Sequence, residues 1–204
     1  MTSTPVRKPL VEAIGEKAYL GAYSAVSFVT LGWMAWAYAA APYVPLWQVP
    51  GVKLWPLVVM PFALVLVAAG VMTKNPSAVG QAGSLKAEEP ARGILRVTRH
   101  PVMWAIALWA AVHLVARGDA ASLVFFGSFL ALALAGTRLI DARKADSLGE
   151  GWARFAAVTS NVPFTAIVEG RNRFSIAEDL ARACASCHAA GDKAVLGAAR
   201  SGSA

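Results

Sequence analysis

The chain has 204 residues, of which 57% are hydrophobic and only 15% are charged. Soluble domains carry roughly 25% charged residues, so this composition excludes an ordinary soluble globular domain. The net charge is +7. In so apolar a chain, the basic residues indicate which loops face the cytoplasm, and they do not indicate a nucleic-acid partner.

Asp, Glu, Lys and Arg are absent from four stretches of the chain, at about residues 21–41, 54–72, 101–116 and 120–137. A helix needs about 20 residues to cross a bilayer and satisfies its own backbone hydrogen bonds there. The stretches lack the alternation of barrel strands. The sequence therefore predicts an all-α, polytopic membrane helical bundle of about four transmembrane helices. Its expected partners are the lipid bilayer and other membrane proteins.

Basic residues gather on alternate sides of these stretches. Three precede the first stretch, five follow the second, and six follow the fourth up to Arg173, whereas the two other loops hold one each. Loops rich in Lys and Arg stay in the cytoplasm. We therefore expect a multi-pass protein of the bacterial inner membrane with both termini in the cytoplasm.

The connections between the stretches carry further signals. Arg117-Gly118-Asp119 predicts a tight helical hairpin, and Pro101 suits a helix start, where its missing N–H has no intrahelical partner. The charged amphipathic segment 139–158 is expected along the cytoplasmic interface. Beyond it, we expect the membrane domain to cover residues 1–172 and a polar, poorly ordered tail to cover 173–204.

Two of the three histidines frame the third stretch: His100 at its start and His113 near its far end. His113 shares a helical stripe with Trp109 and Arg117, and an ionisable residue inside a span suggests a function. The plainer alternatives are an imidazole bonded to a neighbouring helix for His113 and an interfacial cap for His100. Thirteen residues separate the rings by roughly 20 Å, so they cannot share one iron.

A haem iron held by His113 would need its second ligand from another helix. His/Met ligation is chemically sound, and the predicted topology places Met34 and Met60 at about the depth of His113. Methionine is more often a filler of hydrophobic cores.

The segment Cys184-Ala-Ser-Cys187-His188 matches the CxxCH pattern of covalent haem c attachment. Against that interpretation, only 16 residues follow it, none of them Met or His. The predicted topology also places it in the cytoplasm, whereas haem c is attached on the exported side. A thiol pair for a metal or redox role, and a coincidence without function, are the alternatives.

The stretch GILRVTRHPVMWAIALWAAVHLVARGDAASLVFFG, then RLIDARK and LGEGWARFAAVTSNVPFTAIVEGRNRF, resembles the NnrU family of bacterial membrane proteins over about residues 5–176. That family is linked to denitrification by association. Its relative, the plant zeta-carotene isomerase, is a haem b protein, which implies haem b ligation at His100 and His113. The resemblance also implies that relatives carry another hydrophobic helix at each end.

A more distant similarity is to isoprenylcysteine and phospholipid methyltransferases, which carry an RHP motif at a helix start. It implies S-adenosylmethionine binding by Arg99, His100, Arg138, Asp141 and Glu150. Three functions are therefore open. The first is an NnrU-like haem b protein linked to nitrogen-oxide metabolism or isomerase-like redox chemistry. The others are a membrane methyltransferase and a non-catalytic assembly factor.

Overall fold

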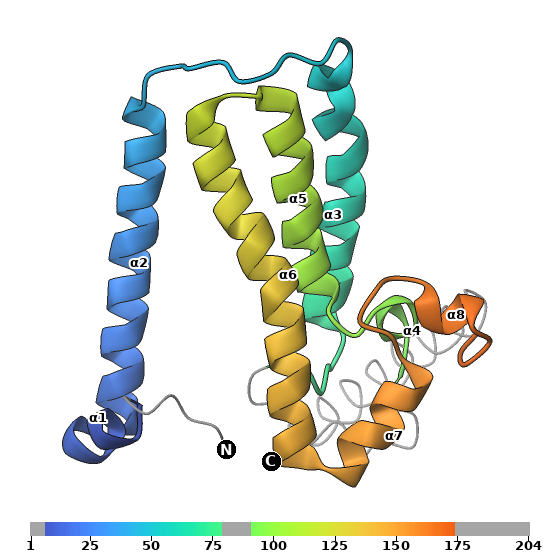
Figure 1. Ribbon diagram of the computed structural model, residues 1–204. Coiled ribbons are helices and arrows are strands. Elements are labelled where there is room, and N and C mark those ends of the chain that lie inside the picture. The colour runs from blue at the N-terminus through green and yellow to red at the C-terminus, as the bar shows by residue number, and fades with distance from the viewer. Residues whose placement is uncertain (1–6, 79–90, 174–204) are drawn as a thin grey trace, which may run out of the picture.

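A computed structural model describes residues 7–78 and 91–173 of the chain (Figure 1). These residues form α1 (Arg7–Ile14), α2 (Glu16–Ala40), η1 (Val52–Leu54), α3 (Trp55–Met72), α4 (Ile94–Val97), α5 (Pro101–Arg117), α6 (Ala120–Leu148), α7 (Glu150–Val158) and α8 (Thr165–Val168). Within the described ranges, β structure is limited to one isolated bridge between Pro45 and Asp119. The predicted all-α class is confirmed.

Three of the described helical segments are long and apolar enough to cross a membrane: Glu16–Ala40, Val52–Met72 and Ala120–Leu148. They correspond to three of the four charge-free stretches in the sequence. The fourth stretch is the apolar helix α5, which has 17 residues and stands at the short end of the spanning range. The total of four spans therefore stays a prediction.

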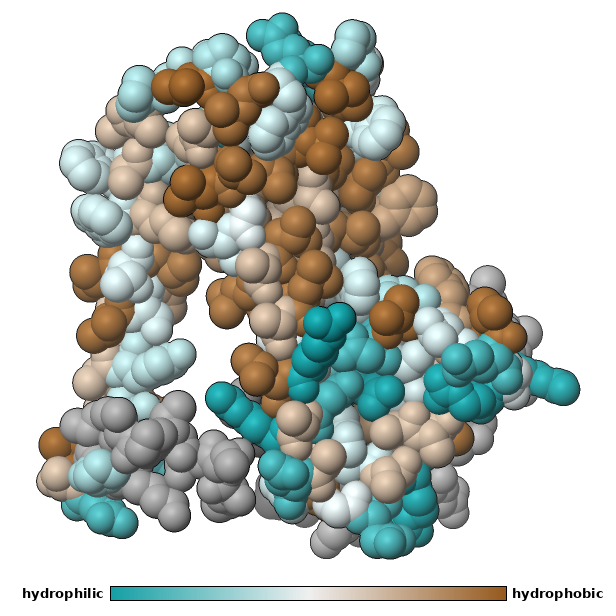
Figure 2. All heavy atoms as spheres, viewed as in Figure 1, coloured by the Kyte–Doolittle hydropathy of each residue, from teal (hydrophilic) through white to brown (hydrophobic). Residues whose placement is uncertain are grey.

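The outer surface of the long helices is apolar. In α2 no residue is buried, and in α3 only Ala63 is. Phe28 is 76% exposed and Leu57 is 73% exposed. Figure 2 shows hydrophobic residues over the helices and hydrophilic ones gathered near α7 and α8. Soluble proteins rarely expose continuous apolar surface of this size, whereas lipid tails match it.

Helix α5 lies between α3 and α6 and makes the most extensive contacts with both. Small residues allow these helices to approach closely. A Cβ atom added to Gly70 would lie 2.8 Å from Pro101 Cγ, and one added to Gly136 would lie 2.5 Å from Met103 Cε. Lipid provides no hydrophobic force between helices, so close van der Waals packing of small residues must hold them together.

Helix α2 stands apart from the other three long helices for most of its length, and Figure 2 shows an opening between it and α6. Its main attachment to the bundle is near its C-terminal end. There the Tyr38 ring stacks on Phe125, with centroids 4.6 Å apart, and the Tyr38 hydroxyl lies 3.0 Å from Ser122 Oγ. We call this side of the molecule, with the α2–α3 loop and the α5–α6 turn, the hairpin end.

The predicted turn between α5 and α6 is present. Gly118 ends α5 in the left-handed conformation with φ 63°, and Asp119 caps α6 by accepting from the Ser122 amide at 2.9 Å and its hydroxyl at 2.6 Å. Burial alone would raise the pKa of Asp119, but these hydrogen bonds and nearby Arg117 outweigh it. The pKa of Asp119 therefore lies below its ordinary value, and the cap stays ionised.

The opposite side, which we call the polar end, contains α4, α7 and α8. Its small core is made by Leu95, Trp152 and Phe155, all almost fully buried. The segment 139–158, which the sequence predicts along the interface, is divided between two helices. Helix α6 continues without a break to Leu148, and the chain changes direction only at Gly149, which has φ 51°.

Candidate functional site

The best-built polar cluster is at the polar end, where α5 begins. His100 precedes the first residue of α5 and is only 3% exposed. Its Nε2 atom lies 2.7 Å from Oδ1 of Asp141, which is on α6. The RHP motif thus places a buried imidazole against a carboxylate 41 residues further along the chain.

Asn161 completes this cluster from the loop after α7. Its Nδ2 donates to Asp141 Oδ2 at 3.0 Å. Its backbone carbonyl accepts from Thr98 Oγ1 and from Trp104 Nε1, both at 2.8 Å. Three segments of the chain therefore meet at one carboxylate, and the loop is fixed to the start of α5.

Arg99 contributes the positive charge of the cluster. Its Nη1 lies 3.7 Å from Asp141 Oδ2, and its Nη2 donates to the Thr159 carbonyl at 3.3 Å. Its Nε atom is buried without a partner among the described residues. Burial lowers the pKa of Arg99, and Arg171 adds to this, against the opposing effect of Asp141. The guanidinium nevertheless stays protonated, so one buried donor is left without an acceptor in the described part of the chain.

The structure brings together some of the residues predicted for this site and not others. Arg99, His100 and Asp141 are in contact. Arg138 and Glu150 are exposed, and neither makes a hydrogen bond or ion pair within the described part of the chain. The sequence reasoning missed Asn161, whose signal was its place in the SNVPF segment of the family resemblance.

His113 lies toward the other end of α5 and is half-buried. Its Nδ1 is 2.8 Å from the backbone carbonyl of Trp109, one turn earlier in the same helix. Since a carbonyl can only accept, Nδ1 donates this hydrogen bond, and in a neutral imidazole Nε2 then keeps its lone pair. Metal-bound histidines show this arrangement, with one ring nitrogen donating to a carbonyl and the other facing the metal. The expected bond to a neighbouring helix is not found among the described residues.

Two aromatic side chains lie beside His113. Phe126 stacks on the imidazole with ring centroids 5.3 Å apart, and Trp109 lies 5.8 Å away. Trp109 also packs edge-on against Phe129 at 5.3 Å. These rings fix the imidazole plane and keep the site apolar.

A second ligand beside His113 is not identified. Met34 is on α2, which packs mainly on α1 and α6, and Met60 is near the start of α3. Among the described residues, no group of three His, Cys, Asp or Glu side chains could hold a metal ion. The segment Cys184–His188 lies outside the described residues. His100 and His113 belong to separate sites, as their spacing predicted.

Comparison with known proteins agrees with the resemblance seen in the motifs. The family model described as NnrU protein matches residues 1–189, a longer stretch than the motifs alone suggested. Searches of curated proteins and of solved structures gave no match. The match contains all the described residues and thus both sites. With a family match over most of its length and helices suited to crossing a membrane, the chain belongs to the NnrU family.

Proposed function

We propose that this NnrU protein binds haem b within the membrane through His113, and that it acts in nitrogen-oxide metabolism or isomerase-like redox chemistry. The observation that supports this proposal is the hydrogen bond from His113 Nδ1 to the Trp109 carbonyl. It fixes the tautomer that an iron ligand requires and makes Nε2 more basic.

The residues around His113 suit a porphyrin. When bound, haem supplies one-electron and ligand-binding chemistry. The role of the protein is to orient the imidazole, which Phe126 does by stacking on it, and to exclude water with the rings of Trp109 and Phe129. Among the described residues, His113 would be the side chain that holds the iron, as a single histidine does in globins and peroxidases.

Replacing His113 by alanine is expected to remove haem from the protein. Changes to groups behind a metal ligand already cost about 10- to 100-fold in affinity, so loss of the ligand itself should reduce occupancy by at least that factor. The measurement is the Soret band of the full chain, expressed with added haem precursor and purified in detergent.

His188→Ala is the matched control and should leave the Soret band unchanged, because that residue belongs to the CxxCH segment rather than to α5. A pyridine haemochrome spectrum distinguishes haem b from covalent haem c. A wild-type protein without a Soret band, or a His113→Ala protein with a full one, would refute the proposal.

The cluster at the polar end favours a second candidate, methyl transfer from S-adenosylmethionine. That molecule carries a carboxylate and cationic groups. The buried, unpartnered Nε of Arg99 suits the carboxylate, and Asp141 suits a cation. Arg99 and Asp141 belong to one cluster that also contains the buried His100, so opposite charges lie within a few ångströms of each other, and a bound ligand would share Asp141 with its present partners.

Under this candidate, Arg99→Ala is expected to weaken S-adenosylmethionine binding by about 30-fold or more, because truncating one member of a buried charge pair costs roughly 2 to 5 kcal/mol. Isothermal titration calorimetry of the detergent-purified chain measures the affinity for S-adenosylmethionine. The exposed Arg138→Ala should bind like wild type. No binding by wild type, or equal binding by both variants, would eliminate this candidate. If the protein also binds no haem, the non-catalytic assembly role is the function that remains.

A further inference from the structure

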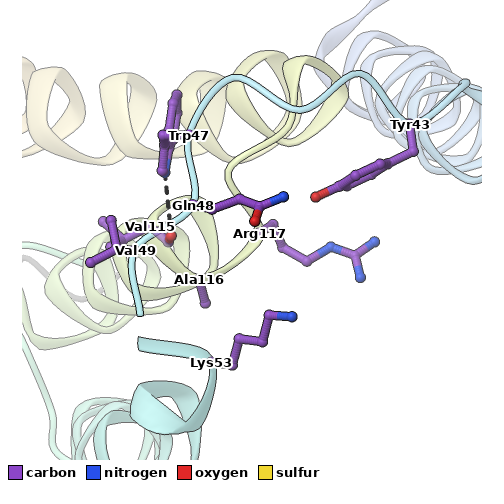
Figure 3. A pocket seen from close by; sticks show the side chains of 8 residues that line it. All are labelled: Tyr43, Trp47, Gln48, Val49, Lys53, Val115, Ala116 and Arg117. Carbon is purple, nitrogen blue, oxygen red and sulfur yellow. Dashed lines mark hydrogen bonds between the residues drawn. The ribbon is translucent and has the colours of Figure 1, made fainter. Parts of the chain in front are cut away.

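A small pocket opens at the hairpin end, between the α2–α3 loop and the last turn of α5 (Figure 3). Its volume is about 50 Å³, and two cationic side chains, Lys53 and Arg117, are part of its lining. Figure 3 shows the polar ends of these two residues, of Gln48 and of Tyr43 around the same space. The pocket is distant in the fold from the His100 cluster and does not include His113.

The frame of the pocket is held by backbone hydrogen bonds. The amides of Leu46 and Trp47 both donate to the Gly118 carbonyl, at 2.8 and 3.1 Å. The Trp47 indole donates to the Val115 carbonyl at 3.3 Å. The loop that supplies Gln48 is therefore fixed to the hairpin that supplies Arg117, and the convergence of their side chains is built into the fold.

The cationic charges in the pocket are not neutralised by ion pairs with the described residues. Arg117 uses Nε to donate to the Tyr38 hydroxyl at 3.2 Å and places its guanidinium over that ring, which leaves both Nη groups available. Lys53 is exposed and makes no ion pair within the described ranges. The nearby carboxylate, Asp119, influences Arg117 electrostatically, but its two oxygens already accept from Ser122.

We propose that this pocket binds a small oxyanion group, such as phosphate. A water needs about 10 to 15 Å³ of such volume, so 50 Å³ has room for a group of three or four oxygen atoms. The planar fork of Arg117 and the compact ammonium of Lys53 are the two cations that proteins use for such groups, and the Gln48 amide can add a donor. The group is either a free ion or the headgroup of a lipid.

The test uses the full chain in a neutral detergent, with inorganic phosphate as the probe and chloride at matched ionic strength as the reference. Phosphate is expected to raise the unfolding temperature in a saturable way. Lys53→Gln should weaken the effect about tenfold, and Lys53→Arg should restore it. Because Lys53 is exposed and without an ion pair in the described ranges, these variants keep the fold. Arg143→Gln, which removes an exposed cation at the polar end, is the control.

A second arm distinguishes the two sources of the group. In nanodiscs of phosphatidylcholine, phosphate should bind as it does in detergent. If phosphatidylglycerol displaces phosphate from the wild-type protein, the natural ligand is a lipid headgroup. If phosphate binds equally well with that lipid present, the natural ligand is a free ion. Either result supports the site. A phosphate effect that does not saturate, or that is equal in wild type and Lys53→Gln, would overturn it.

Discussion

Gly118→Ala is expected to destabilise the protein by at least about 3 kcal/mol. Gly118 has φ 63°, and a Cβ atom there would lie closer than 3.0 Å to the Trp47 carbonyl oxygen. The substitution therefore strains the backbone and also pushes away the loop that donates to the Gly118 carbonyl. Chemical or thermal unfolding of the detergent-purified protein measures the effect.

Gly51→Ala separates the two causes. Gly51 also has a left-handed backbone, with φ 80°, but a Cβ atom there meets nothing within 4 Å. It should cost only the strain of that conformation, about 1 to 2 kcal/mol. If Gly118→Ala costs no more than Gly51→Ala, the close approach of Trp47 does not contribute to stability, and the loop is not fixed to Gly118 in the way proposed.

Asp141→Ala is expected to cost about 3 kcal/mol of stability. It would leave the buried His100, the Asn161 amide and the Arg99 guanidinium without their common partner. Removing one member of a buried pair costs about 3 to 5 kcal/mol, and the lower value applies because the Asp141 side chain is 23% exposed. Unfolding in detergent measures the loss.

Arg138→Ala, one turn away on α6, is the matched control and should change stability by no more than about 0.5 kcal/mol, because its side chain is exposed. The stability of Asp141→Asn should lie between those of Asp141→Ala and Arg138→Ala, because asparagine keeps an acceptor for His100 but loses the charge that faces Arg99. An Asp141→Ala protein as stable as the control would show that the cluster does not hold the loop after α7.

The helices of this protein could be predicted because lipid makes charge the decisive signal. The absence of charge marked the three helices that are long and apolar enough to cross a membrane, and it marked the start and end of α5 to within a few residues. The end of α6 could not be found this way. Arg138 and Asp141 lie on a helix that continues beyond the charge-free stretch, and the break comes at Gly149, where the backbone is left-handed.

The sites were predictable only where they depend on local spacing. The stripe shared by Trp109 and His113 follows from helical periodicity, and the hydrogen bond between them is local. The contacts of Asp141 with His100 and Asn161 join segments far apart in the sequence, and no pattern in one sequence fixes such pairs. Lys53 and Arg117 were each the single basic residue of their loop, and only the folded hairpin end brings them to one pocket.

The turn between α5 and α6 also constrains how the chain enters a membrane during synthesis. Only Gly118 and Asp119 separate the two helices, and the helices make extensive contacts with each other. At about 1.5 Å per residue, α5 is roughly 25 Å long, a little less than the hydrocarbon layer of about 30 Å. Helix α5 is joined directly to the longer α6. If α5 crosses the membrane, we expect the two helices to enter lipid as one antiparallel unit, so that a mutation that expels either helix from lipid would expel both.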